Sequence, residues 1–159
     1  VSIGAINTSL AIVKDGILVL TYSIQTGGNA ISRSIEADFG LTPSQSEEYK
    51  KTYGFSKKGG GKTIGKSTEP ILFSILLEIK KALAFYSQKY KDDAIIQQIL
   101  LSGGTAKLPG IDLFFAENLG IETVVANPWK IFANQQVPAE VLDGSTDYTI
   151  ALGLAMRDL

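Results

Sequence analysis

The sequence contains neither cysteine nor histidine. Without cysteine, the chain forms no disulfide and offers neither a thiolate nucleophile nor a cysteine-based zinc site. Without histidine, it lacks the serine–histidine triad and the usual imidazole metal centres. Any chemistry must therefore use carboxylates, hydroxyls, lysines or a bound cofactor, and we assign no catalytic residue and no metal ligand.

The sequence also has almost no net charge and no long apolar run. The 159 residues carry a formal net charge of -1, which gives no general attraction to nucleic acid or to an anionic membrane. No apolar run approaches the roughly 20 residues of a membrane span, and residues 1–4 lack the features of a signal peptide. We expect a cytoplasmic protein with no nucleic-acid partner. Because Val1 is not a methionine and lies in an apolar run, we also expect the chain to start inside a longer protein.

Residues 1–40 predict three strands followed by a helix. Apolar, β-rich runs cover residues 1–6, 8–13 and 17–24, and Asp15-Gly16 between the last two favours a tight hairpin. A helix is expected next, because apolar residues recur at helical spacing before a glycine that suits a C-cap: Ile31, Ile35, Phe39 and Gly40.

Residues 41–92 predict a smaller, inserted unit. A polar helix begins near Thr42, and a flexible loop rich in glycine and lysine follows over residues 54–67. Residues 67–68 would cap a long amphipathic helix with Pro70 in its first turn. The apolar face of that helix consists of Leu72, Ile75, Leu76, Ile79, Leu83, Tyr86 and Tyr90.

Strands and helices alternate in the second half of the chain. A strand over 95–101 runs into Ser102-Gly103-Gly104, and a second strand covers 122–126. A helix from Pro109 to Gly120 separates them, and residues 148–156 form a final helix. This alternation predicts an α/β layer with parallel strand pairing.

Residues 60–67 match the spacing of a phosphate-binding P-loop, with Gly60 followed by Gly65-Lys66-Ser67. A working P-loop lies between a buried strand and a helix, and the residues before Gly60 are too polar and too rich in glycine for such a strand. Nine of the thirteen residues from 54 to 66 are glycine or lysine, so the pattern arises easily there. A solvated loop is the favoured interpretation, and a P-loop NTPase is kept as an alternative.

Two other segments resemble a different nucleotide-binding scaffold. Residues 3–8, which include Gly4 and Thr8, are similar to the second phosphate loop of the actin, sugar kinase and heat-shock chaperone superfamily. Glycine allows a hairpin backbone to approach a phosphate, and a threonine hydroxyl can donate to it. Residues 100–104, which end in Gly103-Gly104, resemble the adenosine motif of the same superfamily.

More narrowly, the chain resembles the C-terminal half of the PilM family, the actin-like proteins of type IV pilus assembly, which are relatives of the division protein FtsA. The resemblance runs nearly end to end, and the order and spacing of its motifs are more specific than any single one. The motifs are residues 23–29, 46–54, 69–71, 102–104, 108–110, 119–121, 127–129 and 151–155.

The resemblance implies a fold and a set of site residues. The fold is α/β, one lobe of an actin-like, ribonuclease H-like ATPase, with a mixed sheet, flanking helices and a small inserted subdomain. Residues 1–40 and 93–159 would form the main subdomain of the second lobe, and residues 41–92 the inserted one. The phosphates of ATP or ADP would be faced by Gly4, Asn7 and Thr8, and the ribose and base would be bordered by Gly103, Gly104, Thr105, Glu78 and Lys81. For Glu78 and Lys81, a solvated salt bridge is an equal alternative.

Two departures from the family pattern bear on catalysis. Ser2 stands where the family has an aspartate that helps to hold magnesium and its water shell. The first lobe, which carries the catalytic acidic residue in relatives, is absent from this chain. We therefore expect no turnover from the chain alone and at most a weak ATPase, with Mg²⁺, in the longer protein.

The resemblance also implies partners. A PilN-like inner-membrane pilus protein would bind the absent lobe, so the protein would reach the inner face of the cytoplasmic membrane only through partners. The helix with Ala151, Gly153 and Ala155 would pack against the first lobe, and self-association is left open. The alternative to a nucleotide-binding scaffold is a structural interaction module with a degenerate nucleotide site, in an FtsA-like or other envelope machine.

Overall fold

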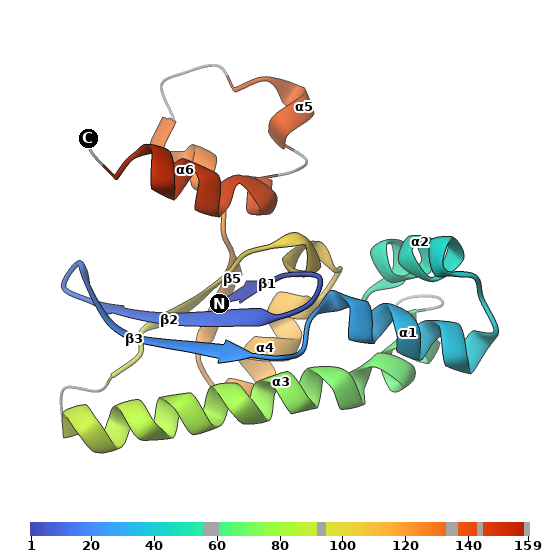
Figure 1. Ribbon diagram of the computed structural model, residues 1–159, viewed down its shortest axis with the longest axis horizontal. Helices are drawn as coiled ribbons and strands as arrows, with labels where there is room; N and C mark the ends of the chain where they lie inside the picture. The colour runs from blue at the N-terminus through green and yellow to red at the C-terminus, as the bar shows by residue number, and fades with distance from the viewer. Residues whose placement is uncertain (56–60, 92–94, 133–136, 143–144, 158–159) are drawn as a thin grey trace.

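The sheet of the protein combines an antiparallel meander with a parallel pair. A computed structural model describes residues 1–55, 61–91, 95–132, 137–142 and 145–157. The meander runs in the order β1-β2-β3, and β4 pairs with β5 in parallel (Figure 1). The strands are β1 (Ser2–Ile3), β2 (Thr8–Lys14), β3 (Ile17–Ile24), β4 (Gln98–Leu101) and β5 (Glu122–Val125).

A parallel bridge between Ser2 and Ser102 joins the two groups of strands. The full spatial order is therefore β3-β2-β1-β4-β5, which confirms the predicted meander and the predicted parallel pairing. At the β2–β3 turn, Asp15 and Gly16 have φ of 51° and 78°, as expected for a tight hairpin. β1 and β4 are shorter than the predicted strands over 1–6 and 95–101.

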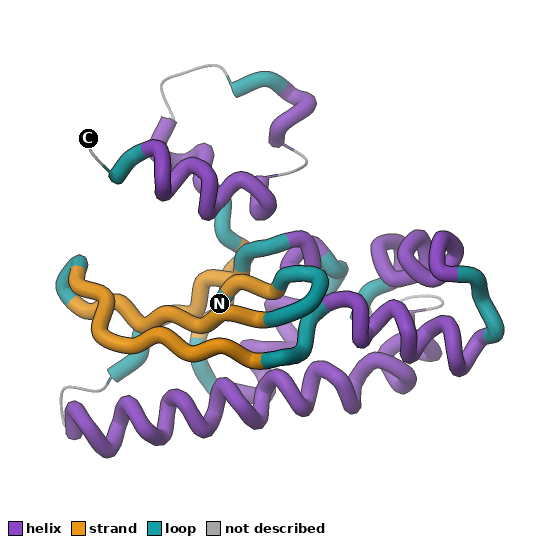
Figure 2. Tube along the Cα trace, viewed as in Figure 1, coloured by secondary structure: helices purple, strands orange, loops and turns teal. Residues whose placement is uncertain are grey.

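Helices flank this sheet (Figure 1). α3 runs along one side of the meander, and α1 and α2 continue from one end of it, as Figure 2 also shows. None of the helices in the described part of the chain combines the length and the hydropathy that a membrane span requires. The α-helices are α1 (Gly28–Phe39), α2 (Pro43–Tyr53), α3 (Gly61–Tyr90), α4 (Ile111–Leu119), α5 (Ala139–Leu142) and α6 (Thr149–Ala155), and the 3-10 turns are η2 (Gly104–Lys107), η3 (Pro128–Phe132) and η4 (Ser145–Tyr148).

Most helix ends follow the local signals. Gly40 and Gly120 adopt the left-handed conformation after α1 and α4. Thr42 begins α2 with a capping box: its hydroxyl accepts from the amide of Gln45, and the Gln45 side chain accepts from the amide of Thr42. These boundaries agree with the sequence prediction.

The start of α3 differs from the sequence prediction. The helix begins at Gly61, so the expected loop through residue 67 and the expected cap at residues 67–68 are wrong; residues 56–60 lie outside the described residues. Ile64 is 3% exposed and shares a helix face with the buried Thr68, whose hydroxyl donates to the Ile64 carbonyl at 2.9 Å. Burial of this face extends the helix past Pro70, against the low helix propensity of the glycines.

The core lies between the sheet and α3. Buried residues of α3 belong to the same hydrophobic cluster as residues of β1, β2, β4 and α4. The division into residues 1–40 with 93–159 and residues 41–92 stays a prediction. The largest fully buried side chains are Ile3, Ile31, Ile35, Leu72, Ile75, Leu76, Ile79, Tyr86, Leu101, Ile111 and Phe115.

Candidate functional site

The first predicted phosphate segment is a tight, exposed turn between β1 and β2. The amide of Gly4 donates to the carbonyl of Asn7 at 3.0 Å, which closes the turn. Ala5, Ile6 and Asn7 are exposed. The residues at the tip of the turn are therefore accessible to solvent, as those of a loop that approaches a ligand must be.

The carbonyls of this turn cap α1. The amides of Gly28 and Asn29 donate to the carbonyls of Gly4 and Ala5, both at 2.8 Å. The N-cap residue, Gly27, makes no side-chain cap hydrogen bond, so these carbonyls satisfy helix amides that a capping side chain would otherwise bind. A Cβ at Gly27 would lie 2.6 Å from the Gly4 carbonyl oxygen, so this close contact requires glycine.

The second glycine segment reaches the same turn from β4. Gly103 has φ 84°, and a Cβ there would lie 2.6 Å from the Ile3 carbonyl oxygen. Two residues later, the Thr105 hydroxyl donates to the Gly4 carbonyl at 3.5 Å. The structure thus brings the Gly4 and Gly103 segments together, as the sequence predicts, and adds Gly28 between them.

The predicted site residues differ in their exposure to solvent. Gly104 is exposed, and a Cβ there would come no closer than 3.6 Å to Asp147 Oδ1. Thr8 is fully buried, and its hydroxyl donates to the Thr26 carbonyl at 2.8 Å. Its hydroxyl therefore holds the end of β3 in place, and its contact with a phosphate stays a prediction.

Glu78 and Lys81 pair with each other on α3. Their side chains form an ion pair at 2.6 Å, and the Tyr22 hydroxyl of β3 donates to Glu78 at 2.7 Å. The hydrogen bonds from Lys81 and Tyr22 hold the pKa of Glu78 below its usual value. These contacts attach α3 to β3, and a role of the pair at a ribose or base stays a prediction.

A second glutamate–lysine pair lies directly against the glycine segments. Lys50 Nζ of α2 donates to the Gly28 carbonyl at 3.3 Å, to Ser32 Oγ at 2.7 Å and to Glu47 at 2.6 Å. Its side chain is only 9% exposed. Residues 46–54 carry part of the family resemblance, but nothing in their sequence predicts a site role. A buried lysine on an otherwise polar helix becomes visible only when α2 packs against α1.

Glu47 is held as a carboxylate in this cluster. Burial alone would raise its pKa, but hydrogen bonds from Lys50 and Ser32 and the charges of Lys50 and Lys51 outweigh burial. The pKa of Glu47 therefore lies below its usual value. The cluster fixes α2 to the first turn of α1, next to the glycine segments.

Thr146 of η4 supports the Gly103 segment. Its carbonyl accepts from the Gly103 amide at 3.2 Å, and its buried hydroxyl has no hydrogen-bond partner among the described residues. Beside it, Asp147 pairs with Lys107 at 2.5 Å. The sequence alone gives no signal for these residues, because they meet Gly103 only through tertiary contacts.

The structure gives no support to a P-loop or a metal centre in the part it describes. Gly65, Lys66 and Ser67 lie inside α3 rather than in a loop before it, so they cannot direct the first amides of that helix at a phosphate. No group of three acidic side chains in the described ranges is arranged to hold a metal ion. Ser2, which the resemblance places where the family has an aspartate, bridges to Ser102 and pairs with Ser9.

Comparison with known proteins points to one family. A family model described as type IV pilus assembly protein PilM matches residues 1–159. The chain is similar to a chain of a solved PilM–PilN type IV pilus biogenesis complex, with a TM-score of 0.78, 24% identity, and coverage of 98% of this chain and 44% of that one.

Two further solved structures share the fold at low identity. MreB5 of Spiroplasma citri bound to AMPPNP matches with a TM-score of 0.69 and 18% identity, over 99% of this chain and 54% of that one. The ethanolamine utilization protein EutJ from Carboxydothermus hydrogenoformans matches with a TM-score of 0.63 and 24% identity, over 78% of this chain and 41% of that one. The chain thus spans about half the length of these solved relatives.

Proposed function

Because the chain belongs to the family of the type IV pilus assembly protein PilM and has an actin-like fold, we propose that it is the second lobe of a nucleotide-binding scaffold for pilus assembly. The observation that carries the nucleotide assignment is the meeting of the Gly4, Gly28 and Thr105 segments at one carbonyl oxygen. Next to this junction Gly104 is exposed, and a Cβ there would meet no atom closer than 3.6 Å, so a nucleoside could lie against the backbone at that position. MreB5, which shares the fold, binds AMPPNP in its solved structure.

In this proposal, Gly4, Asn7 and Thr8 face the phosphates of ATP or ADP, and Gly103, Gly104 and Thr105 border the ribose and adenine. Gly104 is the position best suited to a test, because it is exposed and a side chain there meets no protein atom closely. Gly103 is not suitable, since its φ of 84° and its contact with Ile3 strain any substitution.

Glu78 and Lys81 belong to the same proposal at the ribose and base. Lys81 is 60% exposed, which leaves its ammonium able to turn from Glu78 toward a ligand. Lys81→Met in the full-length protein should weaken nucleotide binding about tenfold, whereas its exposed neighbour Lys80→Met should not. Equal affinities in both variants would leave Glu78 and Lys81 as a surface ion pair.

The main experiment is isothermal titration of the full-length protein that carries this chain. ATP and ADP are titrated with and without Mg²⁺. We expect binding to wild type and its loss in Gly104→Glu, while Ala37→Glu, which adds the same charge on an exposed position of α1, retains it. No heat with either nucleotide in the wild type would overturn the nucleotide assignment.

Ser2 supports one alternative, a structural interaction module with a degenerate nucleotide site. A serine hydroxyl supplies one neutral ligand where a carboxylate would hold Mg²⁺ and its waters. If the site is degenerate, Ser2→Asp should gain affinity for Mg²⁺-ATP that the wild type lacks. In either case we expect no turnover from this chain alone, because it lacks the positioned charge that the first lobe supplies in relatives.

The proposal extends to location and partners. The solved relative is a complex of PilM with PilN, and we propose that a PilN-like inner-membrane protein binds the lobe that precedes this chain. The protein would then act in the cytoplasm at the inner face of the membrane through that partner. Pull-down of the full-length protein, but not of residues 1–159 alone, by a PilN-like cytoplasmic peptide would support this assignment.

A further inference from the structure

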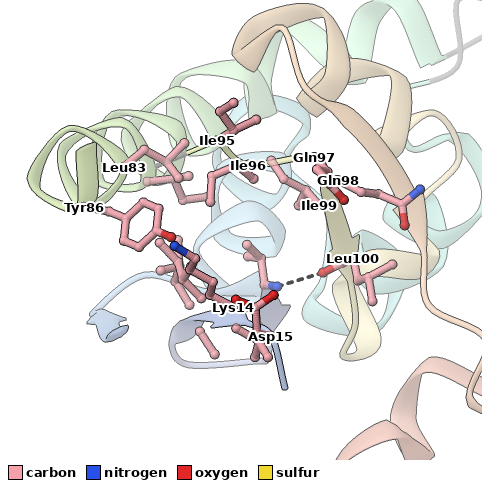
Figure 3. A pocket seen from close by; sticks show the side chains of 16 residues that line it. Lys14, Asp15, Leu83, Tyr86, Ile95, Ile96, Gln97, Gln98, Ile99 and Leu100 are labelled. Carbon is pink, nitrogen blue, oxygen red and sulfur yellow. Dashed lines mark hydrogen bonds between the residues drawn. The ribbon is translucent and has the colours of Figure 1, made fainter. Parts of the chain in front are cut away.

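α3 has two opposite faces. The inward face packs against the sheet: Ile79 and Tyr86 are buried in the hydrophobic cluster, and Leu83 and Tyr86 point toward the strands in Figure 3. The outward face lies on the side of the molecule away from α6, because the sheet lies between the two helices (Figure 1). A first lobe that packs against α6 would therefore leave the outward face of α3 exposed to solvent.

The outward face combines large apolar side chains with lysines. Phe73 and Leu77 are 48% and 55% exposed and lie one turn apart on the same side of the helix. Lys66 and Lys80 lie seven residues before and after Phe73, nearly two turns in each direction, so they share this side. Phe85, which is 56% exposed, continues the apolar surface toward the end of the helix. A surface helix normally turns polar side chains outward, so these apolar residues indicate a binding surface.

The charge on this face is positive, although the whole chain carries a net charge of -1. Glu78 and Lys81 pair with each other, which leaves Glu69 as the one other acidic residue in the described part of α3. The adjacent strand β3 contains no charged residue. Three exposed lysines form no ion pair among the described residues: Lys66, Lys80 and Lys89. The outer face of α3 is the name used here for Phe73, Leu77, Phe85, Lys66, Lys80 and Lys89.

α4 borders the outer face of α3 at Phe73. The rings of Phe73 and Phe114 lie 5.4 Å apart between centroids. α4 carries two acidic residues, Asp112 and Glu117, so the basic surface ends on this side and extends from α3 toward the uncharged β3 instead.

We propose that the outer face of α3 binds an anionic lipid surface. Lysines beside Phe and Leu on one exposed side of a helix are the features with which amphipathic helices lie in the headgroup region of a bilayer. The lysine stems can follow the apolar surface while their ammonium groups reach lipid phosphates. α3 has 30 residues and is therefore about 45 Å long, so it offers a line of contacts to a planar surface.

This inference rests on the proposal that the protein works at the inner face of the membrane. It adds a direct lipid contact to the contact through a PilN-like partner. The lipid contact involves neither the glycine segments nor the absent lobe, so it can be measured without nucleotide and without that partner.

The test is co-flotation of the full-length protein with large unilamellar vesicles. Vesicles of phosphatidylglycerol and phosphatidylcholine in equal parts are compared with vesicles of phosphatidylcholine alone. The first variant, Leu77→Gln with Lys80→Glu, changes the outer face of α3. The matched control, Ile131→Gln with Lys130→Glu, makes the same kind of changes at two exposed positions of η3. A second variant, Lys66→Glu with Lys89→Glu, tests the charges alone, and the Tm of each variant reports its folding.

We expect the wild type to bind the anionic vesicles and both α3 variants to bind them about tenfold more weakly, while the η3 control binds as the wild type does. Binding should also fall at about 0.5 M salt, which screens the lysines. No flotation of the wild type, equal binding to phosphatidylcholine alone, or undiminished binding of the α3 variants would overturn the proposal. Equal losses in the α3 variants and the η3 control would overturn it as well.

A second copy of the chain is the competing occupant of the outer face of α3. It would appear as self-association that increases with protein concentration and is lost in the α3 variants, without binding to vesicles. That result would overturn the lipid assignment. Because nucleotide and partner are absent throughout, failure of the nucleotide or PilN assignment leaves the vesicle result unaffected.

Discussion

The carbonyl oxygen of Gly4 lies 2.8 Å from the amide nitrogen of Gly28. The same oxygen accepts the Thr105 hydroxyl at 3.5 Å. One backbone atom therefore joins the β1–β2 turn, the start of α1 and the segment after β4. Any change that separates Gly4 from Gly28 should disturb the fold and the candidate site together.

Gly27→Ala should destabilise the protein by about 1–3 kcal/mol, since its Cβ would press on rigid backbone rather than on a movable side chain. The nearest atoms would be the carbonyl oxygens of Gly4 and Ala5, at 2.6 and 2.8 Å. The control is Gly65→Ala inside α3, where a Cβ meets nothing within 4 Å and helix propensity should stabilise by about 0.5–1 kcal/mol. Urea unfolding of both variants measures the difference. A Gly27 variant as stable as wild type would contradict the close packing of this junction.

Much of the fold could be predicted because its signals are local. The Asp15-Gly16 turn, the Thr42 capping box and the glycines after α1 and α4 each depend on a few neighbouring residues. The start of α3 could not be predicted, because the glycines and Pro70 disfavour a helix there, whereas the burial of Ile64 stabilises one. Tertiary packing overrides local propensity at such a position.

The candidate site was predictable only in part, for a related reason. Glycines in turns after strands are visible in sequence, so the approach of the Gly4 and Gly103 segments to each other could be predicted. The position of Lys50 could not, because it depends on the packing of α2 against α1, which places its ammonium on the Gly28 carbonyl. Glu78 and Lys81 have helical spacing that is equally typical of a surface ion pair, and spacing alone does not say which pair faces a ligand.

Lys50→Met should lower the free energy of unfolding by roughly 1–3 kcal/mol. The methionine keeps the apolar stem but leaves the Gly28 carbonyl, Ser32 and Glu47 without their shared donor. Lys51→Met, at the exposed neighbouring position, is the matched control and should have little effect. Chemical denaturation near neutral pH measures both, and equal losses would show that the Lys50 cluster does not hold α2 in place.

Glu47 should make stability depend on pH in acid. Its pKa is lower in the folded protein than its usual value of 4.5, so its contribution is present above about pH 4.5 and is lost as the pH falls through the folded pKa. Glu47→Gln should therefore be less stable than wild type near neutral pH, and the difference should shrink below about pH 4.5. Glu48→Gln, at an exposed neighbouring position, is the matched control. Free energies of unfolding measured between acid and neutral pH test this prediction. A difference between Glu47→Gln and wild type that does not change with pH would contradict it.

Substitutions of Ile64 and Lys66 distinguish a core helix from a phosphate-binding loop at residues 61–67. Ile64→Ala should cost about 2–5 kcal/mol, because the isoleucine is buried in the hydrophobic cluster. Lys66→Ala should change stability by less than about 0.5 kcal/mol and leave nucleotide affinity unaltered, since this exposed side chain lies within α3. Denaturation of the chain and ATP titration of the full-length protein test the two variants. Loss of ATP binding in Lys66→Ala, with an Ile64 variant as stable as wild type, would mean that residues 61–67 form a nucleotide loop and that the helix observed there is wrong.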